Sequence, residues 1–232
     1  MKNKKIIKNI TVTIITLKDV IIYNNSPILK YTVEYPEFMS RNCSVGLGII
    51  NRYYKKSALE YKKYILTTIL SAAISDYKNS IKNGYPIHEY EVMQVYTVTY
   101  NQSCTISLYM DRYEYMGGAH GITQRSSQTW NTQSGRQLQL KSLFQCNENY
   151  ISDLKNEIIM QIKEQIEAGN NYYFDNYEEL VMKTFNPKSF YLTPKDLVIY
   201  FQQYDIAPYV SGIVEFYIPY KNLGVQWPYC QL

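Results

Sequence analysis

The stretch Tyr115–Gly121, which reads YMGGAHG, holds the residue types in this sequence that could most readily support chemistry. Three glycines and His120 fall within seven residues. Such a stretch could cradle a phosphate, present a catalytic histidine on a loop, or form a sharp turn. A P-loop needs GxxxxGK followed by Ser or Thr, and a dinucleotide site needs GxGxxG opening a helix. Because these glycines lie between two predicted strands and no lysine follows them, we expect no phosphate site.

A metal site would need more ligands than the sequence offers near His120. His88 and His120 are the two histidines of the chain, and their spacing is neither HxxxH nor HExxH. Both histidines and one carboxylate, from Asp111 or Glu114, could bind a metal if the fold united them. Structural roles for both histidines are the more common outcome, so we expect no metal and no cofactor.

Nucleophilic catalysis would require a base beside a serine or a cysteine. His120 could act on Ser126, Ser127 or the distant Cys104, because catalytic triads assemble in space and not in sequence. No GxSxG motif supports this interpretation, and the pair Glu178-Glu179 is typical of a solvated helix face. We therefore expect no catalytic residues. The alternative is a hydrolytic enzyme of unrecognised type that uses His120.

Two loops and one aromatic segment are candidates for ligand binding. The loop YMGGAHG could present His120, and the stretch YDIAPYVSG could present Pro208 and Tyr209, an aromatic residue beside a proline in an irregular segment. The segment NNYYFDNY, residues 170–177, is a third candidate surface or else a helix connection that packs its aromatic rings inward. The small residues of the first loop form a structural motif for a sharp crossing between strands, at Gly117, Gly118, Ala119 and Gly121.

The composition is that of an ordinary globular protein that is rich in tyrosine. The chain has 232 residues, 46% hydrophobic and 19% charged, with a net charge of +4. No concentrated basic stripe or nucleic-acid motif is present, so we expect no nucleic-acid partner. Tyrosine occurs 26 times and suits glycan or protein surfaces. The high tyrosine content can also result from AT-rich coding, a bias that the excess of lysine over arginine, 19 to 5, indicates.

The N-terminal sequence and the cysteines leave the compartment open. The run MKNKKIIKNITVTIITLKDVII imitates a signal peptide, but polar residues interrupt it and no small-residue cleavage site follows. We interpret the run as a β-strand, and no stretch reaches the roughly 18 apolar residues of a membrane span. The four cysteines form no CxxC pair, so zinc is not expected. They would be free thiols in the cytoplasm or up to two disulfides after export: Cys43, Cys104, Cys146 and Cys230.

The hydrophobic periodicity predicts an α+β fold with mostly antiparallel sheets. Alternation predicts strands near Val12 and over residues 29–35, and again over 88–100, 104–115 and 121–131, with a short strand that ends at 143–144. A long helix over residues 47–83 is predicted by apolar residues at three- and four-residue steps: Ile50, Tyr54, Ala58, Tyr61, Ile65, Ile69 and Ala72. Gly84 and Pro86 end this helix. The C-terminal part is predicted to hold an amphipathic helix over residues 151–166, a short helix within 172–185, and further strands.

The order of these pieces resembles a family of domains of unknown function. The carrying motifs are GGAHG, TQSGRQLQLKSLF, FYLTPKDLVIYFQQYDIAPYVSG and VEFYIPY, over about residues 111–223. The family forms the extracytoplasmic part of RsiV-type anti-sigma factors, occurs beside polysaccharide deacetylases and is related to MPT64. YTVEYPEF, the long helix and the hairpin resemble its usual smaller partner domain. We therefore predict two domains, a β-α-β-β domain over residues 1–110 and the family domain over residues 111–232.

The resemblance implies a binding or sensing module of the bacterial envelope and not an enzyme. It names lysozyme, another envelope protein or a cell-wall glycan as the expected partner. Family members are usually extracytoplasmic, although the chain shows neither a signal peptide nor a transmembrane segment. Without a deacetylase catalytic domain, that activity cannot be carried over.

Overall fold

The chain divides into two compact units that alternate along the sequence. A computed structural model describes residues 10–41, 43–144, 147–170 and 172–223. Of these, unit 1 contains Ile10, Thr97–Tyr109 and the stretch from Arg125 to residue 223, and unit 2 contains Thr11–Tyr96 and Met110–Gln124. The predicted domain boundary between residues 110 and 111 stays a prediction.

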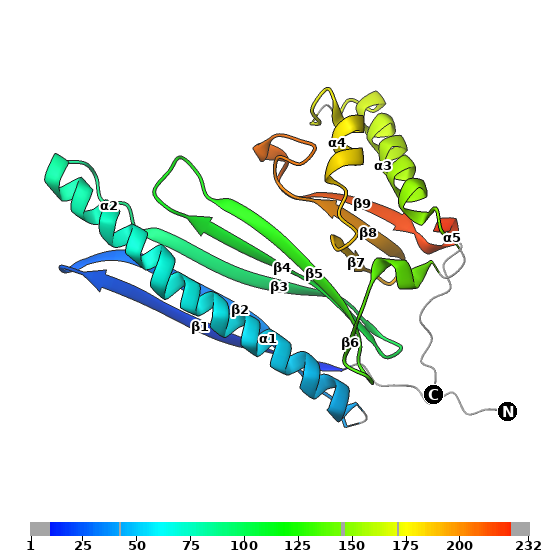
Figure 1. Cartoon of the computed structure of the whole chain (residues 1–232), viewed down its shortest axis with the longest axis horizontal. Helices are drawn as coiled ribbons and strands as arrows, with labels where there is room; N and C mark the ends of the chain where they lie inside the picture. The colour runs from blue at the N-terminus through cyan, green and yellow to red at the C-terminus, as the bar shows by residue number, and fades with distance from the viewer. Residues whose placement is uncertain (1–9, 42, 145–146, 171, 224–232) are drawn as a thin grey trace. The chain divides into compact units, whose positions relative to one another are not determined.

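Unit 2 begins with a long hairpin followed by a long helix (Figure 1). Strands β1 (Thr11–Tyr23) and β2 (Ser26–Met39) pair antiparallel. Asn24 and Asn25 turn the chain at φ values of 47° and 61°, a left-handed conformation that asparagine tolerates better than most residues. Two strands therefore precede the helix, whereas the predicted β-α-β-β order has one. The alternation near Val12 and over residues 29–35 predicts both strands, but the β-α-β-β description of the domain counts only one of them before the helix.

The long helix is confirmed, and it contains a π-helical segment that the periodicity did not reveal. It runs as α1 (Ser44–Tyr64), a π-helical segment (Ile65–Ile69) and α2 (Leu70–Asn83), and it ends at Gly84 with φ 69°. Apolar residues spaced four apart drift around a helix of 3.6 residues per turn. The wider π turn offsets this drift. As a result the buried stripe continues to Ala73, which is 3% exposed, and not to the predicted Ala72.

The helix is fixed to the hairpin at its N-terminal end. The side-chain amide of Asn51 donates to the carbonyl oxygen of Phe38 at 2.9 Å, and its oxygen accepts from the Phe38 N–H at 2.8 Å. Ile50 and Tyr54 are buried in the core of this unit. These contacts hold the face of α1 that carries Tyr61 on the sheet.

The larger sheet has the strand order β1-β2-β3-β4-β5-β6 among the described residues. Three of its strands contain residues of both units, namely β3 (Tyr90–Gln102), β4 (Thr105–Tyr115) and β5 (Ile122–Asn131), and β6 (Arg136–Leu138) belongs to unit 1. β2 and β3 pair in parallel, whereas β1 with β2 and β5 with β6 pair antiparallel. The predicted strand ending at residues 143–144 is wrong in its length, because β6 ends at Leu138 and a 3-10 helix follows over Leu140–Leu143.

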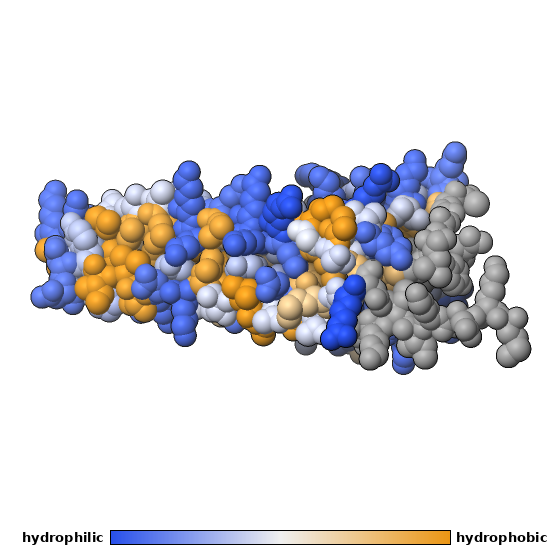
Figure 2. All heavy atoms as spheres, turned by 90° about the horizontal axis from the view of Figure 1, so that it is seen from below, coloured by the Kyte–Doolittle hydropathy of each residue, from blue (hydrophilic) through white to orange (hydrophobic). Residues whose placement is uncertain are grey.

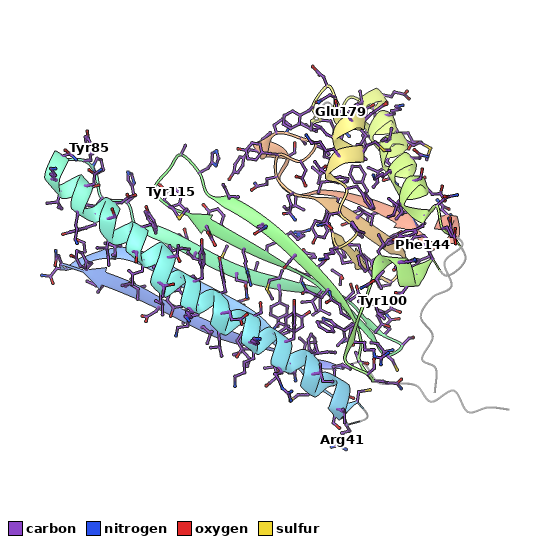
Figure 3. All side chains as sticks on the ribbon, viewed as in Figure 1. Arg41, Tyr85, Tyr100, Tyr115, Phe144 and Glu179 are labelled. Carbon is purple, nitrogen blue, oxygen red and sulfur yellow. The ribbon has the colours of Figure 1, made fainter. Side chains whose placement is uncertain are left out.

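Unit 1 packs helices on a small antiparallel sheet. The sheet contains β7 (Phe190–Leu192), β8 (Asp196–Phe201) and β9 (Val214–Pro219), and the helices are α3 (Tyr150–Glu167), α4 (Tyr177–Thr184) and α5 (Tyr220–Leu223). The apolar stripe of α3 is fully buried against residues of β8 and β9: Leu154, Ile158 and Ile162. Figure 3 shows Phe144 close to the start of α3, where its ring stacks on that of Tyr150 at 4.9 Å. The predicted α+β class is confirmed.

Candidate functional site

Two of the three segments that the sequence marks as candidate binding surfaces lie side by side in unit 1. The Ser211 hydroxyl donates to the carbonyl oxygen of Tyr172 at 3.1 Å. The backbone N–H of Phe174 donates to the carbonyl oxygen of Ile206 at 3.1 Å. These two hydrogen bonds join residues 172–177 to the loop at residues 204–212. A surface that the sequence divides between two segments is therefore continuous in the structure.

The joined segments form one side of a pocket of about 450 Å³, here called the aromatic pocket. Tyr172, Val210 and Tyr217 are 62%, 83% and 48% exposed, so solvent reaches a large apolar area at this place. Exposed aromatic residues around a concavity are typical of protein and glycan binding sites. The complete lining is Gln165, Tyr172, Tyr173, Ala207, Val210, Ser211, Ile213, Val214, Glu215 and Tyr217.

The loop at residues 204–212 is held in an unusual backbone conformation. Tyr204 has φ 68° and Gly212 has φ 63°, both in the left-handed region. Pro208 precedes a 3-10 helix over Tyr209–Ser211, and the rings of Tyr204 and Tyr209 lie 5.9 Å apart. Pro208 and Tyr209 are half-buried, and the loop contributes Ala207, Val210 and Ser211 to the pocket lining. The binding roles of Pro208 and Tyr209 stay predictions.

A partly buried ion pair supports the wall of the aromatic pocket. Arg125 on β5 pairs with Glu215 on β9, and their side chains are only 10% and 24% exposed. The hydroxyl of Tyr191 donates to Glu215 Oε1 at 2.8 Å, and that of Tyr217 donates to Oε2 at 3.0 Å. The Arg125 guanidinium lies over the Tyr109 ring, with Cζ 3.7 Å from the centroid. Each group of the network is thus held by at least one neighbour within unit 1.

Burial and hydrogen bonding keep the phenol of this network protonated. Desolvation, followed by hydrogen bonds with Tyr217 and Glu215, raises the pKa of Tyr191 well above its usual value. Tyr191 therefore acts as a hydrogen-bond donor to the carboxylate of Glu215. The pocket wall therefore presents a carboxylate that Arg125, Tyr191 and Tyr217 hold in place. Glu215 and Tyr217 could not be singled out in the sequence, because β9 alternates like any half-buried strand.

The loop YMGGAHG lies in unit 2, and Figure 3 shows Tyr115 at the end of β4, where this loop begins. His120 is exposed, and its Nδ1 lies 3.2 Å from the carbonyl oxygen of Gly121. Since a carbonyl can only accept, Nδ1 carries the proton in this contact. A role for His120 in ligand binding or hydrolysis stays a prediction.

The glycines of this loop have different reasons for being glycine. Gly117 has φ 82°, a left-handed conformation. A Cβ at Gly121 would lie 2.4 Å from Cε2 of Tyr113, so the ring would have to shift to admit a side chain there. A Cβ at Gly118 would come no closer than 3.9 Å to its nearest neighbour, the carbonyl oxygen of His120. The backbone conformation therefore explains the glycine at position 117, and close packing explains that at position 121. Neither reason applies to Gly118.

The cysteines differ between the units. Cys104 forms a disulfide, and Cys43 is a buried free thiol. Cys146 and Cys230 lie outside the described residues. In the described part of the chain, no group of three or more His, Cys, Asp and Glu side chains could hold a metal ion.

No helix within the described ranges is long and apolar enough to span a membrane. On the face in Figure 2, apolar side chains form patches between hydrophilic ones. Exposed apolar residues of β1 include Ile14, Val20 and Ile22.

Comparison with known families confirms the predicted resemblance. Residues 141–221 match the model of a protein family of unknown function, DUF3298, and residues 22–123 match the model described as deacetylase PdaC. The anti-sigma-V factor RsiV of Bacillus subtilis strain 168 is 35% identical over 105 residues, which are 44% of this chain and 36% of RsiV. The chain thus matches about a third of the length of this curated relative. A relation to MPT64 stays a prediction.

Solved structures share the fold. A DUF3298 family member from Bacteroides fragilis superposes with a TM-score of 0.72 at 17% identity, covering 96% of both chains. A DUF3298 family protein from Pseudomonas aeruginosa PAO1 superposes with a TM-score of 0.64 at 15% identity, again over 96% of both chains. At these identities the likeness establishes the fold alone.

Proposed function

We propose that this chain, with its DUF3298 segment at residues 141–221 and its PdaC-like segment at residues 22–123, is a non-enzymatic binding or sensing module of the bacterial envelope. The aromatic pocket carries the proposal, because it joins exposed tyrosines to a fixed carboxylate in a concavity of about 450 Å³. The relative RsiV is named as an anti-sigma factor, which points to regulation through protein contacts and not to catalysis.

An extracytoplasmic location fits the cysteine chemistry. Disulfides persist in oxidising compartments and are rare in the cytoplasm. The disulfide of Cys104 therefore supports export of the chain.

Lysozyme is the specific ligand that we propose first, and a cell-wall glycan is the second. Calorimetric titration of the chain with lysozyme, and separately with soluble peptidoglycan fragments, distinguishes the two. Tyr172→Ala is the informative variant, because Tyr172 is 62% exposed and contributes little to folding. Truncation of this aromatic anchor should weaken ligand binding at least about tenfold.

Tyr85→Ala is the matched control, since Tyr85 is equally exposed at 62% but lies in unit 2. It should bind like the unmodified chain. Equal affinities of both variants for the bound ligand would remove the aromatic pocket from the proposal. Absence of binding to lysozyme and to peptidoglycan fragments would remove both named ligands.

A further inference from the structure

Unit 2 contains a second concavity, here called the polar groove, of about 510 Å³. Its walls come from α1 and from the facing ends of β4 and β5, on either side of the loop YMGGAHG. The volume lies within the roughly 300–1,000 Å³ typical of small-molecule sites. Its lining includes Ser57, Tyr61, Tyr64, Arg112, Glu114 and Ile122.

Arg112 is fixed in the groove with hydrogen-bonding capacity to spare. Its Nε donates to Gln94 Oε1 at 2.7 Å and its Nη2 donates to the hydroxyl of Ser57 at 3.2 Å. Gln94 is fully buried, and its amide nitrogen donates to the carbonyl oxygen of Glu34 at 2.9 Å, which orients its oxygen toward Arg112. A guanidinium carries five N–H donors, and these contacts use two of them. Within the described residues, the remaining donors have no hydrogen-bond partner.

Glu114 is likewise fixed through one of its two oxygens. The hydroxyl of Tyr61, a residue only 5% exposed, donates to Glu114 Oε1 at 2.8 Å. Desolvation and this hydrogen bond raise the pKa of Tyr61, so the phenol keeps its proton and remains a donor. The second carboxylate oxygen has no hydrogen-bond partner among the residues that the structure describes.

Arg112 and Glu114 both contact Tyr61, and burial lowers the pKa of Arg112 overall, although Glu114 is near enough to raise it. Arg112 lies over the face of the Tyr61 ring, with Cζ 4.1 Å from the centroid, while Glu114 is bound at the Tyr61 hydroxyl. No ion pair joins Arg112 to Glu114 in the described part of the chain. Partly buried charges with unused donors and acceptors are normally satisfied by ligand or water. A ligand that carries an anionic and a cationic group close together would satisfy both.

An apolar wall borders these charges. Tyr64, Met116 and Ile122 line the groove and are 40%, 48% and 59% exposed. Met116 and Ile122 flank the loop at residues 117–121, so the path that the glycines allow brings both side chains to one wall. The π-helical segment begins at Ile65, directly after Tyr64, and such segments are frequent at functional sites.

We propose that the polar groove binds a zwitterionic amino-acid centre, with the ligand carboxylate on Arg112, its ammonium group on Glu114 and its aliphatic side chain against Ile122. The ligand is a free amino acid, since only a free amino acid carries both charged groups on one carbon, whereas each end of a peptide carries one of them. The site lies wholly in unit 2 and is independent of the aromatic pocket of unit 1.

The test uses leucine as the probe with two analogues that each lack one charge. N-acetylleucine has no ammonium group, and leucinamide has no carboxylate. Calorimetric titration of the full chain should show that leucine binds at least about tenfold more tightly than either analogue, since each loses one charge-assisted contact. The dipeptide glycyl-leucine should bind more weakly than leucine, because its ammonium and carboxylate groups lie on different residues.

Glu114→Gln should lose the preference for leucine over N-acetylleucine and keep the preference over leucinamide. Ile122→Ser, at an exposed position, should weaken the binding of leucine and of both analogues, while leaving the ratios of their affinities unchanged. Glu91→Gln is the control, because Glu91 pairs with Lys30 at 3.2 Å on unit 2 outside the groove lining. No binding of leucine up to about 10 mM, tighter binding of glycyl-leucine than of leucine, or equal binding of leucine and its analogues would overturn the proposal.

Discussion

Each unit places an arginine on the face of a tyrosine ring, but the two arginines meet different neighbours. In unit 1, Arg125 lies 3.7 Å from the centroid of Tyr109 and forms an ion pair with Glu215. In unit 2, Arg112 lies 4.1 Å from the centroid of Tyr61 and donates to the neutral groups of Gln94 and Ser57. One positive charge is neutralised inside the unit, and the other faces a groove.

The difference separates a stabilising role from a binding role. In a partly buried ion pair, each charge depends on its partner. Removing one partner leaves the other charge buried without compensation, which destabilises the fold. A charge that is held by neutral groups retains attraction for an external counter-ion. Mutation should therefore affect stability most in unit 1 and ligand recognition most in unit 2.

Arg125→Met is expected to cause the largest loss of stability. The substitution leaves the Glu215 carboxylate, 24% exposed, without its guanidinium, which should lower the free energy of unfolding by about 3 kcal/mol. Urea denaturation followed by circular dichroism measures the change. Lys163→Met breaks an ion pair with Glu178 in which the two side chains are 53% and 55% exposed, and it should change the stability much less, because solvent screens exposed pairs. Equal losses in the two variants would contradict the comparison.

The cysteines extend the contrast between the units. Cys104→Ser should lower the free energy of unfolding by about 3 kcal/mol, because a disulfide restricts the unfolded chain. Alkylation in denaturant without a reducing agent, followed by mass spectrometry, should label Cys43 and leave Cys104 unlabelled. Labelling of Cys104 under these conditions would show that the thiol is free and would remove the support for export.

Gly121→Ala should be destabilising by about 2 kcal/mol, because the new Cβ would lie 2.4 Å from the ring of Tyr113. Gly118→Ala is the matched control three residues earlier, where the nearest atom is 3.9 Å away. There alanine should be neutral or stabilising by up to about 1 kcal/mol, since it restricts the unfolded chain. Thermal unfolding of both variants measures this. Equal changes in stability for the two variants would mean that contact with the Tyr113 ring does not distinguish the two positions.

Much of the fold could be predicted because it follows local rules. The long helix was evident from Ile50, Tyr54, Ala58 and Tyr61, and Gly84 ended it as a left-handed C-cap should. The register shift from Ala72 to Ala73 could not be predicted, because π turns are rare and no pattern of apolar residues in the sequence marks this one.

The candidate sites were predicted less completely, because their geometry is non-local. The segments at residues 172–177 and 204–212 stood out as aromatic and irregular, but their union depends on backbone hydrogen bonds between them. Arg125 and Glu215 are 90 residues apart in sequence, and no spacing rule connects them. His120 is a rare residue type in this sequence, and the sequence marks Glu114 only as a possible metal ligand, whereas Arg112 resembles any polar position of an alternating strand.

The two phenols that accompany the arginines should make the smallest and most specific contribution, which depends on pH. Burial raises the pKa of both Tyr61 and Tyr191 above the usual value near 10. The folded state therefore favours their protonated forms, and this stability is fully present below about pH 10 and is lost as the pH rises further. The loss approaches about 1.4 kcal/mol per pH unit for each phenol.

Urea midpoints from neutral pH to about pH 11 should fall less steeply in Tyr61→Phe and Tyr191→Phe than in the unmodified chain. Tyr85→Phe, at a position 62% exposed, should leave the slope unchanged. An unchanged slope in Tyr61→Phe alone would mean that the hydrogen bond to Glu114 does not persist in solution, and the fixed carboxylate of the polar groove would lose its support.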